Sequence, residues 1–181
     1  MKYVRFIPIA VLAFAVACND AATAPAPGAP SVAITFKPRS GPTVNFASAS
    51  SGNLASNFDI SGLGNDPANG FVTVEATAHA DAVYACRNNG GNFPSDPKKT
   101  NVSSDVKVDQ NFPIKNGRAA GTLILPVPAN TTLSCPGGQH VVLASITWTD
   151  VVIAVVSPPG PTADSSSPGI QDAYSKTFFN I

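Results

Sequence analysis

The longest alternating run in the chain, residues 71–86, constrains the fold more than any other feature of the sequence. Valine, alanine, tyrosine and cysteine occupy its even positions from Val72 to Cys86, whereas threonine, glutamate, histidine and aspartate occupy the odd positions 73–81. Because neighbouring side chains of a β-strand point to opposite faces, this run predicts a strand with one buried and one solvent-facing side. Strands usually span roughly 3 to 10 residues, so we expect a bend, bulge or turn near Ala78–Ala82.

Similar patterns recur between clusters of glycine and proline, which together make up 31 of 181 residues. No window of a dozen residues keeps a helical period without interruption, so helix is disfavoured. We expect further strands at residues 32–36, 57–61, 102–108, 119–127, 140–149, 151–156 and 174–179. About eight short strands joined by polar turns predict an all-β chain that folds as a single antiparallel β-sandwich of the immunoglobulin type, with a barrel as the second architecture.

A second alternating run, residues 140–149, contains the only tryptophan of the chain. Its even positions from Val142 to Trp148 are apolar, and its odd positions from Ser145 to Thr149 carry hydroxyl groups. This parity favours a core role for Trp148 over an exposed platform for sugar rings.

Residues 1–17 have the three parts of a secretory signal peptide. Lys2 and Arg5 precede an apolar stretch, which ends in the triplet Ala-Val-Ala at 15–17. As a helix, the twelve residues 6–17 would span only about 18 Å, against about 30 Å for the hydrocarbon core of a bilayer. We therefore expect export with cleavage of this leader, not a permanent membrane span.

Cys18 follows the leader directly, and the sequence AVAC resembles the lipobox of bacterial lipoproteins. The resemblance implies that Cys18 is lipidated, becomes the new N-terminus and holds the protein on a membrane of the bacterial cell envelope. The lipobox prefers leucine where this chain has Ala15, and the same triplet suits ordinary signal peptidase, so free secretion is the alternative. Residues 18–30 then form a lipidated cysteine with an Ala/Pro-rich tether, and residues 31–181 form the β-sandwich domain.

The charge of the exported chain argues against nucleic acid as a partner. Removing Lys2 and Arg5 with the leader leaves nine basic and eleven acidic residues, a formal charge of −2. Nucleic-acid binding depends on a basic surface that neutralises phosphates, and this composition does not provide one.

The two remaining cysteines, Cys86 and Cys135, are predicted to form a disulfide. Lipidation of Cys18 leaves an even number of thiols, and exported proteins fold where disulfides persist. A reactive or metal-binding pair is the alternative, but neither cysteine has a second cysteine nearby at the spacing of a zinc site.

The stretch CRNNGGNFP at 86–94, together with Asn116-Gly117, CPGGQ at 135–139 and Thr149-Asp150-Val151, resembles a pattern in small exported bacterial β-proteins of uncharacterised activity. The resemblance covers roughly residues 71–156. It implies one disulfide-closed domain and no particular chemistry.

The sequence favours a role without catalysis. The only histidines, His79 and His140, lie in no nucleophile elbow or zinc-protease motif, and Glu75 is the single glutamate. His79 is predicted on the solvent-facing side of its strand and His140 at the start of another. A Ser-His-Asp site assembled from distant residues stays open as the alternative of a secreted hydrolase, because such sites are defined by geometry.

No cofactor or metal site is predicted. Calcium prefers oxygen ligands, which side chains offer at Asn65, Asp66 and Asn69 or at Asp96, but the alternating acidic spacing of an EF-hand is absent. Turn formation explains these residues more simply. Asn101 and Asn130 begin sequons that accept glycans only in a suitable secretory pathway, which a bacterial lipobox argues against.

The connection 87–100 is the best sequence candidate for a ligand loop, because it exceeds the usual hairpin loop of roughly 2 to 5 residues. Phe93 is a possible exposed aromatic among amides and cations, or else it packs back into the core. The candidate residues are Arg87, Asn88, Asn89, Asn92, Phe93, Lys98 and Lys99. The expected function is that of an envelope lipoprotein whose β-sandwich has a binding or structural role, with an envelope protein or a glycan as the ligand if it binds. An accessory subunit of an envelope complex is a further alternative.

Overall fold

The structure is a computed structural model that describes residues 33–39, 41–64 and 70–181. The chain divides between Ser31 and Val32 into two units, and all described residues belong to the second. The predicted leader, the lipid site Cys18 and the tether lie outside the described residues. The turn residues Asn65, Asp66 and Asn69 lie outside them as well.

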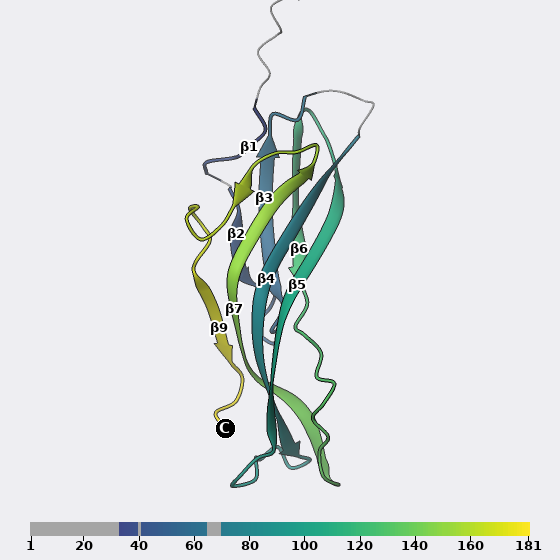
Figure 1. Cartoon of the computed structure of the whole chain (residues 1–181), viewed down its shortest axis with the longest axis vertical. Helices are drawn as coiled ribbons and strands as arrows, with labels where there is room; N and C mark the ends of the chain where they lie inside the picture. The colour runs from purple at the N-terminus through teal and green to yellow at the C-terminus, as the bar shows by residue number, and fades with distance from the viewer. Residues whose placement is uncertain (1–32, 40, 65–69) are drawn as a thin grey trace, which may run out of the picture. The chain divides into compact units, whose positions relative to one another are not determined.

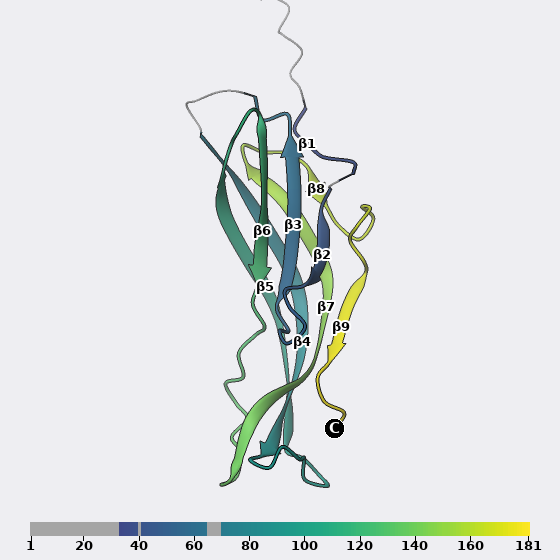
Figure 2. The same cartoon turned by 180° about the vertical axis from the view of Figure 1, so that it is seen from behind.

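The described residues form two antiparallel sheets that pack against each other, which confirms the predicted β-sandwich (Figures 1 and 2). In sheet A, β3 pairs along its length with β6, and β1 and β2 pair with its two ends. Sheet B has the order β5, β4, β7, with β8 and β9 pairing with β7. The strands of sheet A are β1 (Thr35–Phe36), β2 (Thr43–Phe46), β3 (Leu54–Ser61) and β6 (Arg118–Leu125). Those of sheet B are β4 (Phe71–Asn88), β5 (Lys99–Pro113), β7 (Gln139–Ser157), β8 (Thr162–Ala163) and β9 (Ala173–Thr177).

The alternation predicted for residues 71–86 is confirmed in β4 as far as Ala82. Every even-numbered residue from Val72 to Ala82 is buried, and the odd-numbered residues from Thr73 to Asp81 are half-buried or exposed. Sheet B therefore turns its valines and alanines toward sheet A and its threonines, acids and histidine outward.

The prediction of two separate strands at residues 140–149 and 151–156 is wrong, because they form one strand. Residues 140–149 and 151–156 belong to the continuous strand β7, in which Asp150 has a positive φ of 52°. At this point Thr77 pairs with Val152 and His79 with Thr149, so β7 has one residue more than β4. The left-handed residue makes a β-bulge instead of a turn, and the buried positions change from even before Asp150 to odd after it. The irregularity expected near Ala78–Ala82 is present in the pairing, with its extra residue on the partner strand.

Another bulge corrects the predicted side of Val142. Ser145 pairs with Val83 and Leu143 with Tyr84, so Ala144 is the extra residue. Val142 consequently pairs with Ala85 and is half-buried, whereas Leu143 pairs with Tyr84 and packs against the core. The two strands absent from the sequence prediction, β2 and β8, have only four and two residues.

Two close contacts join the sheets in the core. The ring of Phe112 from sheet B meets Phe58 of sheet A edge to face, with ring centroids 4.6 Å apart. Gly121 on β6 leaves room for this ring, because an added Cβ would overlap Phe112. Trp148 is fully buried and its indole Nε1 donates to the carbonyl oxygen of Gly52 at 2.9 Å, which confirms its predicted core role.

The described domain has a long axis with different structures at its two ends. β1, the first described strand, lies at one end, and the turn that follows β4 lies at the other (Figure 1). At that second end β4, β5 and β7 extend beyond the strands of sheet A (Figures 1 and 2).

Candidate functional site

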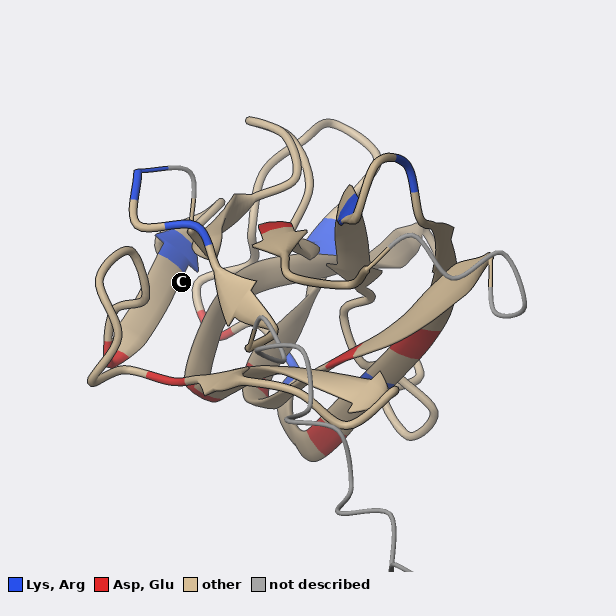
Figure 3. Ribbon diagram, turned by 90° about the horizontal axis from the view of Figure 1, so that it is seen from above, with Lys and Arg blue, Asp and Glu red and all other residues tan. Residues whose placement is uncertain are grey.

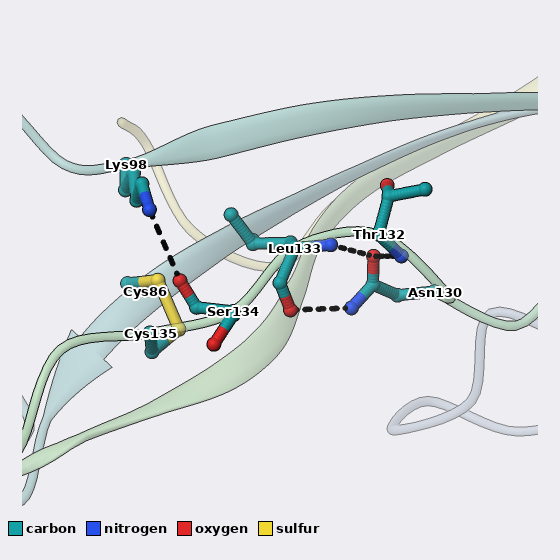
Figure 4. The surroundings of a disulfide bond; sticks show 7 residues. All are labelled: Cys86, Lys98, Asn130, Thr132, Leu133, Ser134 and Cys135. Atoms are coloured by element: carbon teal, nitrogen blue, oxygen red, sulfur yellow. Dashed lines mark hydrogen bonds between the residues drawn. A yellow bond between two sulfur atoms is a disulfide. The ribbon is translucent and has the colours of Figure 1, made fainter.

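The end of the domain opposite β1 is closed by the predicted disulfide, and we call residues 86–99 and 133–140 the disulfide tip. The Cys86–Cys135 bond joins the end of β4 to the segment between β6 and β7 (Figure 4). The backbone N–H of Cys86 donates to the carbonyl of Lys98 at 2.9 Å, and the Lys98 ammonium donates to the carbonyl of Ser134 at 3.3 Å. The disulfide prediction is confirmed, and these two hydrogen bonds add to the contacts that hold the tip together.

Asn130 braces the segment that leads to the disulfide (Figure 4). Its side-chain Nδ2 donates to the carbonyl of Leu133, and its Oδ1 accepts from the N–H groups of Leu133 and Thr132. These three bonds give the asparagine of this sequon a structural role, because short polar side chains stabilise turns by bonding the backbone a few residues away.

The predicted ligand loop folds around its own aromatic residue. Phe93 is half-buried and meets the ring of Phe179 from the C-terminal segment, with centroids 5.4 Å apart. The Arg87 guanidinium lies 4.4 Å from the Phe179 centroid and 5.7 Å from the Phe93 centroid, and its Nε donates to the carbonyl of Gly91 at 2.7 Å. Phe93 is therefore neither an open platform nor part of the sandwich core, and Arg87 is held by the loop itself.

The other predicted loop residues differ in their hydrogen bonds and in their exposure. Asn88 accepts the N–H of Asn92 through its Oδ1 at 2.8 Å, which shapes the turn. Asn89, Asn92, Lys98 and Lys99 are exposed. Ser95 and Asp96 are exposed as well. The loop is shorter than predicted, because Arg87 and Asn88 still belong to β4 and Lys99 begins β5.

A hollow of about 330 Å³ lies at the tip and joins the loop to the segment before β7. Its lining is Pro94, Asp96, Pro97, Lys98, Pro136 and Gln139. Three prolines make the wall stiff, while a carboxylate, an ammonium and an amide provide hydrogen-bond acceptors and donors. The hollow suits a polar ligand.

A second cluster lies on the outer face of sheet B, around His79. Its Nδ1 is 2.6 Å from Oδ1 of Asp105, and its Nε2 is 2.9 Å from Oγ of Ser103. Asp81 Oδ1 lies 3.7 Å from the same Nε2. A hollow of about 330 Å³ adjoins the cluster and is lined by Thr77, Ala78, His79, Asp105 and Asp150.

The electrostatics of this face favour the charged form of His79. The hydrogen bond that His79 donates to Asp105 is the largest cause that raises the pKa of His79 above 6.5. Burial opposes this rise, and the charges of Asp81, Asp105 and Asp150 add to it. In Figure 3 most Asp and Glu segments occupy the lower half of the view and most Lys and Arg segments the upper half. Lys107, two residues from Asp105 on β5, is paired with Glu75, with Nζ 2.6 Å from Oε2.

Sequence reasoning placed His79 correctly on the outward side of β4 but missed its partners. Ser103 and Asp105 are two residues apart, so they share a face of β5, and their parity is visible in the sequence. The register that sets Asp105 opposite His79 and Ser103 opposite Asp81 is a property of the paired strands. His140 is exposed near the start of β7, as predicted, and belongs to the disulfide tip.

Within residues 33–39, 41–64 and 70–181, no group of three or more His, Cys, Asp or Glu side chains has the arrangement of a metal site. The same residues contain no helix long and apolar enough to cross a membrane.

No protein-family model matches the chain, and a search of curated proteins finds no significant match. The function proposed below rests on the residues of this chain and on their geometry.

Proposed function

We propose that the protein is a lipid-anchored component of the bacterial cell envelope, whose β-sandwich binds a polar glycan at the disulfide tip. Support for the anchor comes from the signal-like leader, the AVAC sequence that ends in Cys18, and the proline-rich stretch that follows. A tether of 12 residues in extended polyproline form reaches roughly 37 Å, which clears the headgroups of a bilayer.

The observation that carries the proposal is the position of the tip. The tether would join the domain beside β1, and the tip lies at the other end of the long axis (Figure 1). The tip is therefore the part of the described domain that lies farthest along its long axis from the first described strand, and we propose that a partner reaches it there. The tip is also the part of the domain where a disulfide and several backbone contacts hold a long polar loop in one conformation, and binding residues are often found on loops held by a rigid scaffold.

The chemistry of the hollow favours a glycan over a lipid. Asp96, Lys98 and Gln139 offer donors and acceptors for hydroxyl groups, and the prolines offer small apolar patches for the C–H faces of a sugar ring. The aromatic ring that the sequence suggested, Phe93, contributes by supporting the loop from behind, where it packs on Phe179.

Two experiments test the two parts of the proposal. For the anchor, wild-type protein should enter the detergent phase of a temperature-induced partition, and Cys18→Ser should leave it in the aqueous phase; a wild type that stays in the aqueous phase contradicts the anchor.

For the tip, immobilised envelope glycan should retain the wild type and lose the double variant Asp96→Ala/Gln139→Ala. The matched control is Asp109→Ala/Gln110→Ala, which removes the same two side chains from the exposed end of β5. Equal retention of both variants contradicts tip binding. A third outcome is that the wild type retains no glycan but captures one envelope protein, and that the tip variant loses this capture. In that case the partner at the tip is a protein and not a glycan.

A further inference from the structure

The cluster around His79 has the connectivity of a nucleophile, a base and an orienting acid. Asp105 accepts the Nδ1 proton of the imidazole at 2.6 Å, which leaves Nε2 facing the hydroxyl of Ser103 at 2.9 Å. In hydrolases of the Ser-His-Asp type, the carboxylate holds Nδ1–H and the serine hydroxyl bonds to Nε2, and the arrangement recurs on unrelated folds. No motif in the sequence joins these three residues, because they come together only through the pairing of β4 with β5.

The register of β5 also supplies a backbone donor beside Ser103. The residues just before and after β5 are hydrogen-bonded to the β4 strand or its extension: Cys86 N–H donates to Lys98, and Ile114 N–H donates to Gly70. In this register the even-numbered residues of β5 therefore direct their backbone N–H and C=O groups toward β4. In an antiparallel pair the intervening residues direct their N–H groups away from the partner. Ser103 therefore points its N–H to the other edge of β5, and in the described part of the chain β5 pairs with β4 alone.

The charges around the imidazole suit the state that forms during acyl transfer. When Ser103 loses its proton to His79, the imidazole becomes a cation. Asp105 contacts it at one nitrogen, Asp81 lies 3.7 Å from the other, and Asp150 borders the hollow beside it. Lys107, the cation nearest along β5, is neutralised by Glu75.

We propose that Ser103, His79 and Asp105 form a hydrolytic centre for small acyl esters on the outer face of sheet B. Ser103 Oγ attacks the ester carbonyl carbon as its proton passes to His79 Nε2, and the tetrahedral oxyanion accepts from the Ser103 N–H. The C–O bond to the alcohol then breaks, and the alcohol leaves with the proton from His79. Water, deprotonated by His79, attacks the acyl-serine, the carboxylic acid leaves, and Ser103 regains its proton.

The exposure of the site determines the substrate class. The side chain of Asp105 is 91% exposed and that of His79 is 34% exposed, so water weakens the electrostatic interactions on which catalysis depends. The single backbone N–H is one donor fewer than the usual pair, a loss that typically costs about 10²–10³-fold in rate. Esters with good leaving groups and short acyl chains fit this open, weakly stabilised site, whereas amides demand more stabilisation of the oxyanion.

The test uses the full-length protein, 4-nitrophenyl acetate as substrate and a fluorophosphonate as a covalent probe. The probe should label Ser103, located by peptide mass spectrometry, and Ser103→Ala should abolish this label and reduce ester turnover to background. His79→Gln should lower turnover by at least about 100-fold, since a general base typically contributes about 10²–10⁴-fold. The matched control is Ser175→Ala, because Ser175 bonds Thr147 on the same sheet face at 3.0 Å with no histidine in the pair.

The covalent label separates this mechanism from the weak esterase activity that any surface imidazole provides. The inference is overturned if the wild type turns over ester no faster than Ser103→Ala, or if the probe labels Ser103 no more than Ser175. Turnover should rise with pH through the pKa of His79, since only the neutral imidazole accepts the proton. This site and the disulfide tip use different residues, so Ser103→Ala should leave glycan retention unchanged, and failure of one proposal does not imply failure of the other.

Discussion

The indole N–H of Trp148 in sheet B donates to the carbonyl oxygen of Gly52, which lies in the connection between β2 and β3 of sheet A. The bond is 2.9 Å long and buried. Gly52 allows this approach because an added Cβ would come within 2.8 Å of Leu143 and Val127. This hydrogen bond connects the β2–β3 turn of sheet A to β7 of sheet B. The absence of a side chain at Gly52 allows the two sheets to approach closely enough for the bond to form.

Replacing Trp148 by phenylalanine should lower the free energy of unfolding by about 2–4 kcal/mol. The substitution leaves the Gly52 carbonyl without its buried donor and creates a cavity in the core, where Trp148 is fully buried. Because Trp148 is the only tryptophan, unfolding of both proteins should be followed by far-UV circular dichroism in denaturant. A loss below about 1 kcal/mol would show that the bond contributes little.

Reduction of the Cys86–Cys135 disulfide should lower the melting temperature by roughly 10 °C. The bond closes a loop of 49 residues, which in the chain-entropy model corresponds to about 4 kcal/mol. Calorimetry with and without reductant measures the shift. The variant Cys86→Ala/Cys135→Ala, heated with and without reductant, is the control, and an unchanged wild-type melting temperature on reduction would contradict the prediction.

Ser56→Ala should leave the domain as stable as before or stabilise it by up to about 1 kcal/mol. Ser56 is fully buried on β3, and within the described part of the chain its hydroxyl has no hydrogen-bond partner. A buried hydroxyl without a partner costs desolvation energy that alanine avoids. Ser61→Ala, at an exposed pair with Thr35, is the control for the loss of a serine from the same strand. Destabilisation by more than about 1 kcal/mol in denaturant titrations would indicate an unseen partner.

Gly121→Ala should destabilise the domain by about 1–3 kcal/mol, because the new methyl group would overlap the Phe112 ring. The control is Gly137→Ala, since an added Cβ at Gly137 meets no atom within 4 Å. Phe112→Leu in the Gly121→Ala background should recover part of the loss if overlap is its cause. Equal unfolding curves for Gly121→Ala and Gly137→Ala would contradict this account.

The pKa of His79 should be above 6.5, and Asp105→Asn should lower it, because the hydrogen bond to Asp105 is the main cause of the shift. A pKa raised by folding stabilises the domain below about pH 6.5, and this contribution disappears as the pH rises through the folded-state value. The melting-temperature difference between wild type and His79→Gln should therefore be larger at about pH 6 than at about pH 9. An NMR titration of the imidazole gives the pKa directly, and a value at or below 6.5 would contradict the prediction.

Much of the architecture was determined by the sequence alone, because the physical cause is local. Alternating burial in β4 follows from strand geometry, so Val72 and its even-numbered neighbours could be assigned to the core without a structure. The disulfide was predictable because, with Cys18 set apart, Cys86 could pair only with Cys135. The polar loop after Cys86 was visible as a break in the strand patterns, but its bounds were too wide, because pairing with neighbouring strands extends β4 to Asn88 and begins β5 at Lys99.

Tertiary structure alone decided which residues meet between strands. The bulge at Asp150 joined two expected strands into one, because the pairing with β4 continues on both sides of that residue. Phe93 found its partner in Phe179, which lies 86 residues away in the chain. The His79 cluster depends on the register that sets Asp105 opposite His79, and a shift of one residue would place Asp105 on the inner face. Register is set by the packing of whole sheets and by bulges in a partner strand, so no local pattern around His79 contains it.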